Sequence, residues 1–284
     1  THNHSHHKYT NILDMDDDVG YGLLRVTRDQ PWRPRNLLNV PFNAMLAAGF
    51  EWGIALQHLE IGKIVDRETR PATLVRLGEL SAKAGRQLVK DYLAWPVLTA
   101  LSPSNFGRPG FLATLKANAL ANVARNLWTN AVIFCGHFPD GAEKFTTTDM
   151  VGESRGQWYL RQMLGSANID AGPILALLTG NLSYQIEHHL YPNLPSRRLA
   201  EISVRVRQLC DKYDLPYTSG PLPVQYAKSW RTIAKLSLPD RFLRASADDA
   251  PETRSERMFD VLDTRARGLK TAIAAVRRRR QPAV

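Results

Sequence analysis

The first long apolar segment of the chain runs from Val40 to Leu59 and contains two ionisable residues, Glu51 and His58. A helix needs about 20 mostly apolar residues to cross a lipid bilayer, so the segment has the required length. Its ionisable residues would be costly in lipid. The pattern therefore predicts a helix over residues 40–59 that is either a marginal membrane span or part of the protein core.

A charged stretch and two further apolar runs follow. Residues 61–90 form a helical pattern rich in Lys and Arg, residues 91–101 a short apolar run, and residues 111–135 a long helical pattern. The sequence SPSNFGRPG between the two runs is typical of a turn. We interpret the runs as a hairpin that enters and leaves a membrane, which keeps the basic stretch in the cytoplasm. The alternative, with crossings at 40–59 and 111–135, places that stretch outside the cell.

An asparagine recurs every four residues along the last of these helical patterns. The repeat comprises Asn118, Asn122, Asn126 and Asn130. At about 3.6 residues per turn these amides form one polar stripe, and His137 falls on the same side if the helix continues. Because amides without partners are costly in lipid, the stripe must face another helix or a site. Hydrogen bonding between helices and the lining of a site both remain open.

The composition, with 44% apolar and 23% charged residues, is that of a folded protein. A net charge of +10 suits nucleic acid, an anionic membrane surface or an acidic substrate as partner. Since the sequence has no nucleic-acid-binding motif and its charge is spread along the helices, we expect a lipid membrane and no nucleic acid as partner. The basic C-terminal tail, residues 231–284 with Arg277 to Arg280, is expected to be partly disordered.

Seven of the eight histidines lie in three short segments. In the first segment His2, His6 and His7 share one sector of a helix, and in the third Gln185, His188 and His189 do so. The second segment contains His137, at the end of the helix with the asparagine stripe. Neutral imidazole binds Zn, Cu, Fe and Ni, so histidines from different helices predict one or two metal ions without identifying the metal. The first segment could also be a tag remnant, but the sequence KYTNILDMDDD that follows argues against a tag.

These segments resemble the histidine boxes of membrane fatty-acid desaturases. HNHSHHKYTN is similar to the second box, SYQIEHHLYP is similar to the third box in its Gln-x-x-His-His form, and CGHFPDG resembles a segment that supplies an extra histidine between them. The resemblance covers residues 1 to about 230, which we take as the desaturase domain. It is strongest to the mycobacterial-type acyl-CoA desaturases of actinobacteria, including those that form stearoyl-CoA Δ9 products.

The resemblance implies an all-α, integral membrane domain with a cytoplasmic helical cap that carries the histidine boxes and a di-iron centre. In such a family the two iron ions activate O2, and a cis double bond enters an acyl-CoA or acyl-lipid chain. NADPH supplies electrons indirectly, through a separate flavin and iron–sulfur oxidoreductase or a ferredoxin-type donor. The implied location is the bacterial plasma membrane, with the boxes facing the cytoplasm.

The residues that the resemblance implies as catalytic and as iron ligands are His2, His6, His7, His137, His188 and His189. Gln185 and Asn181 are implied as further cofactor-binding residues. Gln185 occupies a position that is histidine in many relatives, and three roles remain open for it: a weak ligand, a hydrogen-bond partner of metal-bound water, or neither.

The family's first histidine box and first pair of transmembrane helices lie upstream of the second box. We therefore expect the sequence to be an N-terminally truncated fragment, whose iron site is incomplete and whose activity belongs to the full-length parent. Two other functions remain open. One is a di-iron fatty-acid or alkane hydroxylase, and the other is an inactive, basic protein that only associates with membranes.

Overall fold

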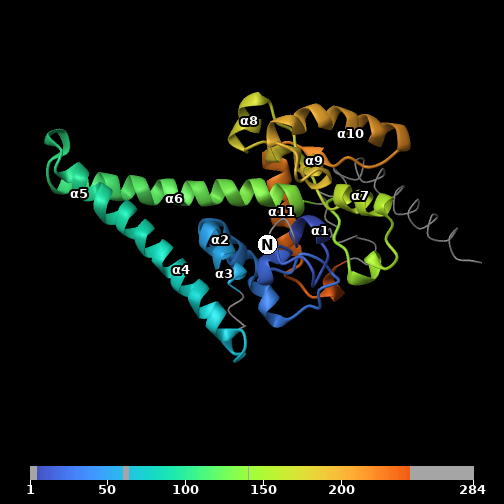
Figure 1. Cartoon of the computed structure of the whole chain (residues 1–284), viewed down its shortest axis with the longest axis horizontal. Coiled ribbons are helices and arrows are strands. Elements are labelled where there is room, and N and C mark those ends of the chain that lie inside the picture. The colour runs from blue at the N-terminus through green and yellow to red at the C-terminus, as the bar shows by residue number, and fades with distance from the viewer. Residues whose placement is uncertain (1–4, 60–63, 140, 244–284) are drawn as a thin grey trace, which may run out of the picture. The chain divides into compact units, whose positions relative to one another are not determined.

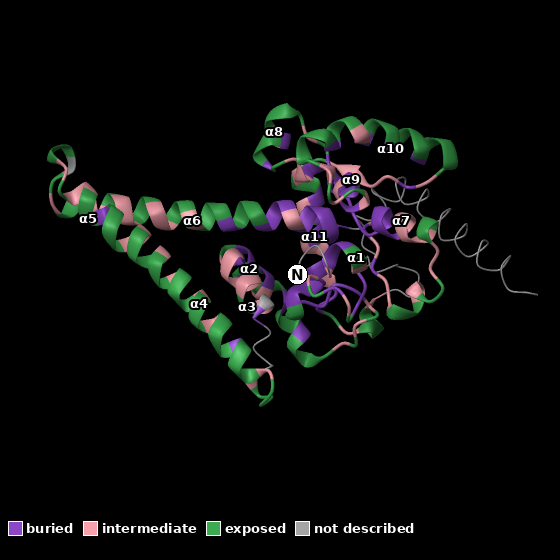
Figure 2. Cartoon of the chain, in the orientation of Figure 1, coloured by how far each residue is buried: buried purple, intermediate pink, exposed green. Residues whose placement is uncertain are grey.

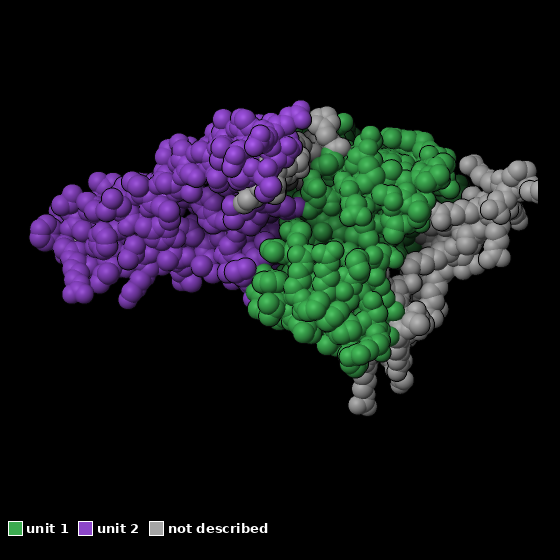
Figure 3. Space-filling view, turned by 90° about the horizontal axis from the view of Figure 1, so that it is seen from below, with its two compact units in different colours: residues 1–43, 131–284 green, residues 44–130 purple. Residues whose placement is uncertain are grey.

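The computed structural model of the chain describes residues 5–59, 64–139 and 141–243, which are mostly helical (Figure 1). The predictions for His2 and for residues 244–284 of the tail, with Arg277 to Arg280, lie outside the described residues. The chain forms two compact units, coloured separately in Figure 3. Unit 1 comprises residues 1–43 and 131–284, and unit 2 comprises residues 44–130.

The predicted single helix over residues 40–59 is wrong. The segment forms two helices, α2 (Asn39–Ala48) and α3 (Phe50–His58). Gly49 separates them with φ −117° and ψ 33°, a conformation outside the α-helical region. Within the part of the chain that the structure describes, no helix has both the length and the hydropathy that crossing a membrane requires.

Two helical arms joined by a turn form at the predicted place, but the first arm also includes the charged stretch that was expected to precede the hairpin. One arm is α4 (Arg70–Val89), which continues through a π-helical turn, η4 (Lys90–Ala94), into α5 (Trp95–Ala100). A turn with the short 3₁₀ helix η5 (Pro103–Asn105) leads into α6 (Arg108–His137). The long helix α6 leaves unit 2 after Asn130, and its last turns belong to unit 1.

The asparagine stripe of α6 makes hydrogen bonds between helices. Asn118 donates to the backbone oxygen of Asp91 (2.6 Å), and Asn122 donates to the Tyr92 hydroxyl (3.0 Å). The side-chain oxygen of Asn126 accepts from the backbone N–H of Glu51 on α3 (3.0 Å). The first of the two roles left open for the stripe is therefore confirmed for these three residues.

Unit 2 exposes many large apolar side chains, and the arm formed by α4 and α5 is mostly exposed (Figure 2). Examples are Leu98 (58% exposed), Phe106 (74%) and Leu120 (71%). Apolar surface of this extent is typical of an interaction surface rather than of a face in contact with water.

Unit 1 contains the other helices of the described chain. They are α1 (His6–Tyr9), η1 (Gly20–Gly22), η2 (Pro34–Leu38), η6 (Thr147–Met150), α7 (Arg155–Leu164), α8 (Pro173–Leu178), η7 (Leu182–Tyr184), α9 (Gln185–Leu190), η8 (Ser196–Arg198), α10 (Leu199–Tyr213), α11 (Leu222–Lys235) and η9 (Asp240–Phe242). Its two strands, β1 (Asn168–Ile169) and β2 (Ser219–Gly220), pair in parallel. The all-α prediction is thus confirmed for the described residues apart from this one short pair.

Two apolar clusters hold unit 1 together. Met163 of α7, Ile186 of α9, and Val206 and Cys210 of α10 form one, which joins the three helices. At the end of α6, the ring of Phe134 stacks on that of Tyr21 at 5.8 Å and packs on Phe138. These clusters fix α7, α9 and the end of α6 around α1.

Candidate metal centre

Five of the six histidines expected to bind metal converge in unit 1. His6 and His7 come from α1, His137 from the end of α6, and His188 and His189 from α9. The shortest distances between ring centroids are 4.6 Å for His7 and His188, and 4.7 Å for His6 and His137. All are buried except His188, which is half-buried. The structure therefore brings together residues separated by as many as 183 positions.

Three of the imidazoles present nitrogen atoms to one point. One ring nitrogen each of His6, His137 and His189 lies within 4.8 Å of the other two, and all three residues are buried. Nitrogen atoms at this spacing can contact one transition-metal ion after small shifts of the rings.

Helix α7 holds the single turn of α1 in place. The Gln162 side chain donates to the backbone oxygen of His7 (2.9 Å), and Arg161 and Trp158 donate to that of Lys8 (3.2 and 3.3 Å). The last four carbonyl groups of a helix have no hydrogen-bond partners within it, so the carbonyl groups of the four-residue helix α1 need partners from elsewhere. The side chains of α7 supply these partners and so fix the position of His6 and His7.

Asp16 orients the ring of His6. Its carboxylate lies 2.9 Å from Nδ1 of His6 and also accepts from the backbone N–H groups of Asn11 (2.8 Å) and Asp18 (3.0 Å). Since a carboxylate only accepts, Nδ1 of His6 carries the proton and Nε2 keeps the lone pair that a metal needs. Burial opposes protonation of His6, but the hydrogen bond and charge of Asp16, with the charge of Asp18, raise its pKa.

Thr10 orients His189 in a similar way. The Thr10 hydroxyl lies 2.7 Å from the backbone oxygen of His6, 2.7 Å from Oε1 of Gln162 and 3.0 Å from Nδ1 of His189. The first two neighbours only accept, so the hydroxyl proton goes to one of them and Nδ1–H of His189 donates to the hydroxyl oxygen. Nε2 of His189 is again left without a proton.

His189 is held in its neutral form. Burial lowers its pKa well below the ordinary value, and the charges that His137, His6, His7 and His188 carry when protonated lower it further. Only neutral imidazole coordinates a metal. The buried and oriented imidazoles therefore fit a transition-metal ion such as iron.

Gln185 lies inside this cluster. Its amide nitrogen is 2.9 Å from Nε2 of His137 and 3.2 Å from Nε2 of His189, so it donates towards the atoms that would bind metal. Its buried side-chain oxygen accepts no hydrogen bond from the described residues. A metal ion or a water bound to it would provide a partner, and the choice among the three roles of Gln185 stays a prediction.

Asn181 lies four residues before Gln185, in the turn that precedes η7. It has the left-handed conformation (φ 63°), and its backbone N–H donates to Ala176 (2.7 Å). Its expected role in cofactor binding also stays a prediction.

The sequence interpretation missed Asp16, Thr10 and Gln162. Asp16 belongs to the acidic sequence DMDDD, which follows the first histidine segment and was the one available signal. Nothing in the local sequence marks Thr10 or Gln162, because their partners lie in other segments.

Gly136 has no side chain, and the side chain of Gln185 occupies the space beside it. A Cβ atom at Gly136 would lie 2.8 Å from Cγ of Gln185. We expect Gly136→Ala to displace Gln185, to lower the free energy of unfolding by about 1–3 kcal/mol and to weaken metal binding. Denaturant unfolding and metal titration measure both effects.

A matched control is Gly85→Ala in α4, where an added Cβ has no neighbour within 4 Å. This change is expected to leave metal binding unaltered and to stabilise the helix by up to about 1 kcal/mol. Equal behaviour of the two variants would show that Gly136 does not determine the position of Gln185.

The family model for fatty acid desaturase matches residues 1–221, which include all of the histidines of the centre. The chain belongs to the fatty acid desaturase family. The desaturase is accordingly an oxidoreductase, in agreement with the family that its histidine segments resemble.

The desaturase is similar to curated proteins from several organisms. It is 68% identical over 292 residues to the NADPH-dependent stearoyl-CoA 9-desaturase of Mycobacterium tuberculosis H37Rv, an alignment that covers 99% of this chain and 67% of the relative. It is 36% identical over 118 residues to the Delta(8)-fatty-acid desaturase of Euglena gracilis, covering 42% of this chain and 27% of the relative. No solved structure matches the chain significantly.

Proposed function

We propose that the desaturase introduces a cis double bond into a long-chain acyl-CoA at a di-iron centre that includes His6, His7, His137, His188 and His189. The observation that carries this proposal is the convergence of these imidazoles, from three distant segments, in a chain of the desaturase family. His2 belongs to the proposed ligand set from the sequence motif alone.

The name of the Mycobacterium tuberculosis relative supports the substrate and the source of electrons. That protein is a stearoyl-CoA 9-desaturase and is NADPH-dependent. Removing two hydrogen atoms from the acyl chain while reducing O2 to two water molecules takes two more electrons and two protons. We propose that NADPH supplies these electrons through a separate reductase, as the resemblance to this family implies.

The chain's own residues prepare the centre for metal. Iron, when bound, supplies the O2 and one-electron chemistry that amino-acid side chains lack. Asp16 and Thr10 hold the Nδ1 protons of His6 and His189, which directs both Nε2 lone pairs towards the centre. Gln185 donates towards Nε2 of His137 and of His189 and would orient a metal-bound water or act as a weak ligand.

We propose that the exposed apolar surface of unit 2 contacts lipid, with the centre facing the cytoplasm of a bacterial plasma membrane. The support is the exposure of large apolar residues such as Leu98 and Leu120 on a hairpin whose Asn118 and Asn122 side chains are hydrogen-bonded internally. A lipid-facing surface would also bring a membrane-dissolved acyl chain to the protein.

Product analysis tests the proposed reaction. The protein is incubated with stearoyl-CoA, O2, NADPH, ferredoxin and ferredoxin reductase, and the acyl products are examined by mass spectrometry. We expect a product that has lost two hydrogen atoms and that depends on added iron.

A product that has gained one oxygen atom would instead identify the hydroxylase. An iron-loaded protein that gives neither product, in the isolated system and in membranes of cells that express it, would contradict both enzymatic functions for residues 1–284 by themselves.

A further inference from the structure

Glu187 lies in α9, between Gln185 and His188 in the sequence, but its side chain points away from the metal centre. One helical turn separates Gln185 from His189, so both face His137, whereas Glu187 is rotated by about 200° from Gln185. Glu187 is completely buried. A buried carboxyl group needs partners, because an unpaired one would be strongly destabilising.

Both oxygens of this carboxyl group accept a hydrogen bond. Oε2 accepts from the side-chain amide of Asn168 (2.9 Å), and Oε1 accepts from the hydroxyl of Tyr217 (2.9 Å). The Asn168 amide also donates to the Tyr217 hydroxyl (2.6 Å). The three side chains form a closed ring of hydrogen bonds, which we call the α9 lock.

Asn168 connects the lock to the helix backbone as well. Its side-chain oxygen accepts from the N–H of Ile186 (2.8 Å), which is one of the donors that the first turn of a helix leaves without a partner. Its own N–H donates to the oxygen of Thr218, beside β2 (2.8 Å). The short parallel pair of β1 and β2 therefore brings Asn168 and Tyr217 together at α9.

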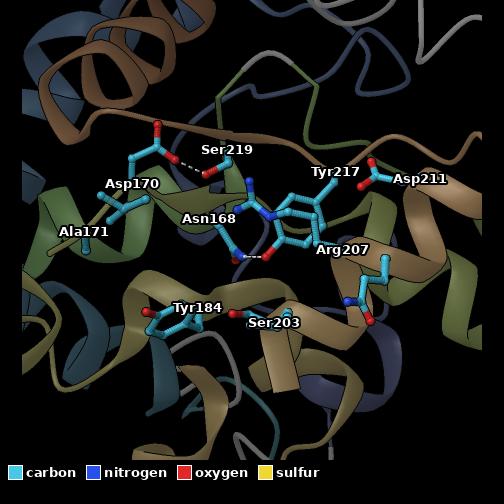
Figure 4. A pocket seen from close by; sticks show the side chains of 12 residues that line it. Asn168, Asp170, Ala171, Tyr184, Ser203, Arg207, Asp211, Tyr217 and Ser219 are labelled. Atoms are coloured by element: carbon cyan, nitrogen blue, oxygen red, sulfur yellow. Dashed lines mark hydrogen bonds between the residues drawn. The ribbon is translucent and has the colours of Figure 1, made fainter. Parts of the chain in front are cut away.

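The outer end of the lock lies at the wall of a cavity of about 480 Å³ (Figure 4). Asn168 and Tyr217 line this cavity, and the guanidinium group of Arg207 lies over the Tyr217 ring at 4.6 Å. This cation–π contact with the ring does not require the hydroxyl. The hydroxyl can be removed without emptying the space that the ring fills.

Helix α9 depends on such contacts. It has six residues, and an isolated helix of this length is not stable. Ile186 anchors one side in the apolar cluster of Met163, Val206 and Cys210. An apolar contact alone permits small rotations, whereas hydrogen bonds to both Glu187 and the Ile186 N–H define the rotation of the helix.

We infer that Asn168, Glu187 and Tyr217 are positioning residues, which set the rotation of α9 and thereby aim His188 and His189 at the metal. A site of this kind must be held to within about 0.5 Å to bind its metal well. The inference rests on the proposed metal centre, because it concerns the orientation of two of its histidines.

Titration of the metal-free protein with Co²⁺ tests the lock, since the visible absorption bands of Co²⁺ report the ligands and their geometry. We expect Tyr217→Phe to weaken Co²⁺ binding about fivefold, and Glu187→Ala to weaken it at least tenfold. Both should change the band positions or intensities per bound ion. Glu187→Gln should largely restore binding, because its amide can still accept from Asn168 and can donate to the hydroxyl of Tyr217.

The matched controls are Tyr213→Phe and Glu201→Ala, exposed residues of α10 that should leave binding and spectrum unchanged. Circular dichroism checks folding, and Tyr217→Phe alone decides the test if Glu187→Ala does not fold. Folded lock variants with the affinity and spectrum of the unaltered protein would overturn the lock alone. Failure of the unaltered protein to bind Co²⁺ would overturn the metal centre and the lock with it.

Discussion

Replacing His189 with alanine is expected to abolish desaturation and to remove most of the bound iron. His189 is fully buried, and its ring lies 4.7 Å from that of His7 and 4.9 Å from those of His6 and His137. We expect at least about a 100-fold loss of activity, since a metal site that loses a central ligand loses its metal as well as its geometry.

The measurements for His189→Ala are the iron content per protein chain and the amount of unsaturated product. Lys8→Ala is the control, because Lys8 neighbours His7 in sequence but its side chain is exposed. The control should retain both iron and activity. Iron content and product formation at the level of the unaltered protein in His189→Ala would contradict the assignment of the centre.

Replacing Asp16 with asparagine should have the next largest effect. The two carboxylate oxygens of Asp16 accept from His6 and from two backbone N–H groups, and an amide can accept through one atom only. If the amide nitrogen faces His6, the imidazole proton moves to Nε2 and blocks the lone pair that would bind metal. If it faces the backbone, an N–H group loses its partner.

We expect Asp16→Asn to weaken metal binding by about 10–100-fold and to lower the free energy of unfolding by about 1–3 kcal/mol. Metal titration and denaturant unfolding measure the two effects. Asp17→Asn is the matched control. Asp17 is adjacent to Asp16 in the sequence, but its side chain is exposed, whereas that of Asp16 is buried. The role of Asp16 would be refuted by identical metal affinities in the two variants.

The local sequence was sufficient to predict the helical class and to single out histidines that the structure brings together. Helical patterns depend on neighbours within a few positions, so the sequence predicts the helices over residues 61–90 and 111–135 that the structure contains as α4 and most of α6. The same holds for the third histidine segment, where Gln185 and His189 are one turn apart and do face the same centre. The motif resemblance added the order of the segments, which led to the family.

The break at Gly49 shows where local pattern reasoning failed. The apolar run continues through this glycine, so hydropathy alone predicted one long helix. Glycine adopts many backbone conformations at little cost, and whether it interrupts a helix depends on what the flanking segments contact. The hydrogen bond from the Glu51 N–H to Asn126, 75 residues away, is one such contact.

The sequence by itself determined which side chains could bind a metal and that they belong to a desaturase. Only the tertiary structure decided how these side chains are held, through Asp16 at His6, Thr10 at His189, and Asn168 and Tyr217 at Glu187. The physical reason is that ligand type is a property of each residue, whereas a hydrogen bond between Thr10 and His189 joins positions 179 residues apart. Such a partner becomes identifiable only when the packing of α7, α9 and α10 brings the segments together.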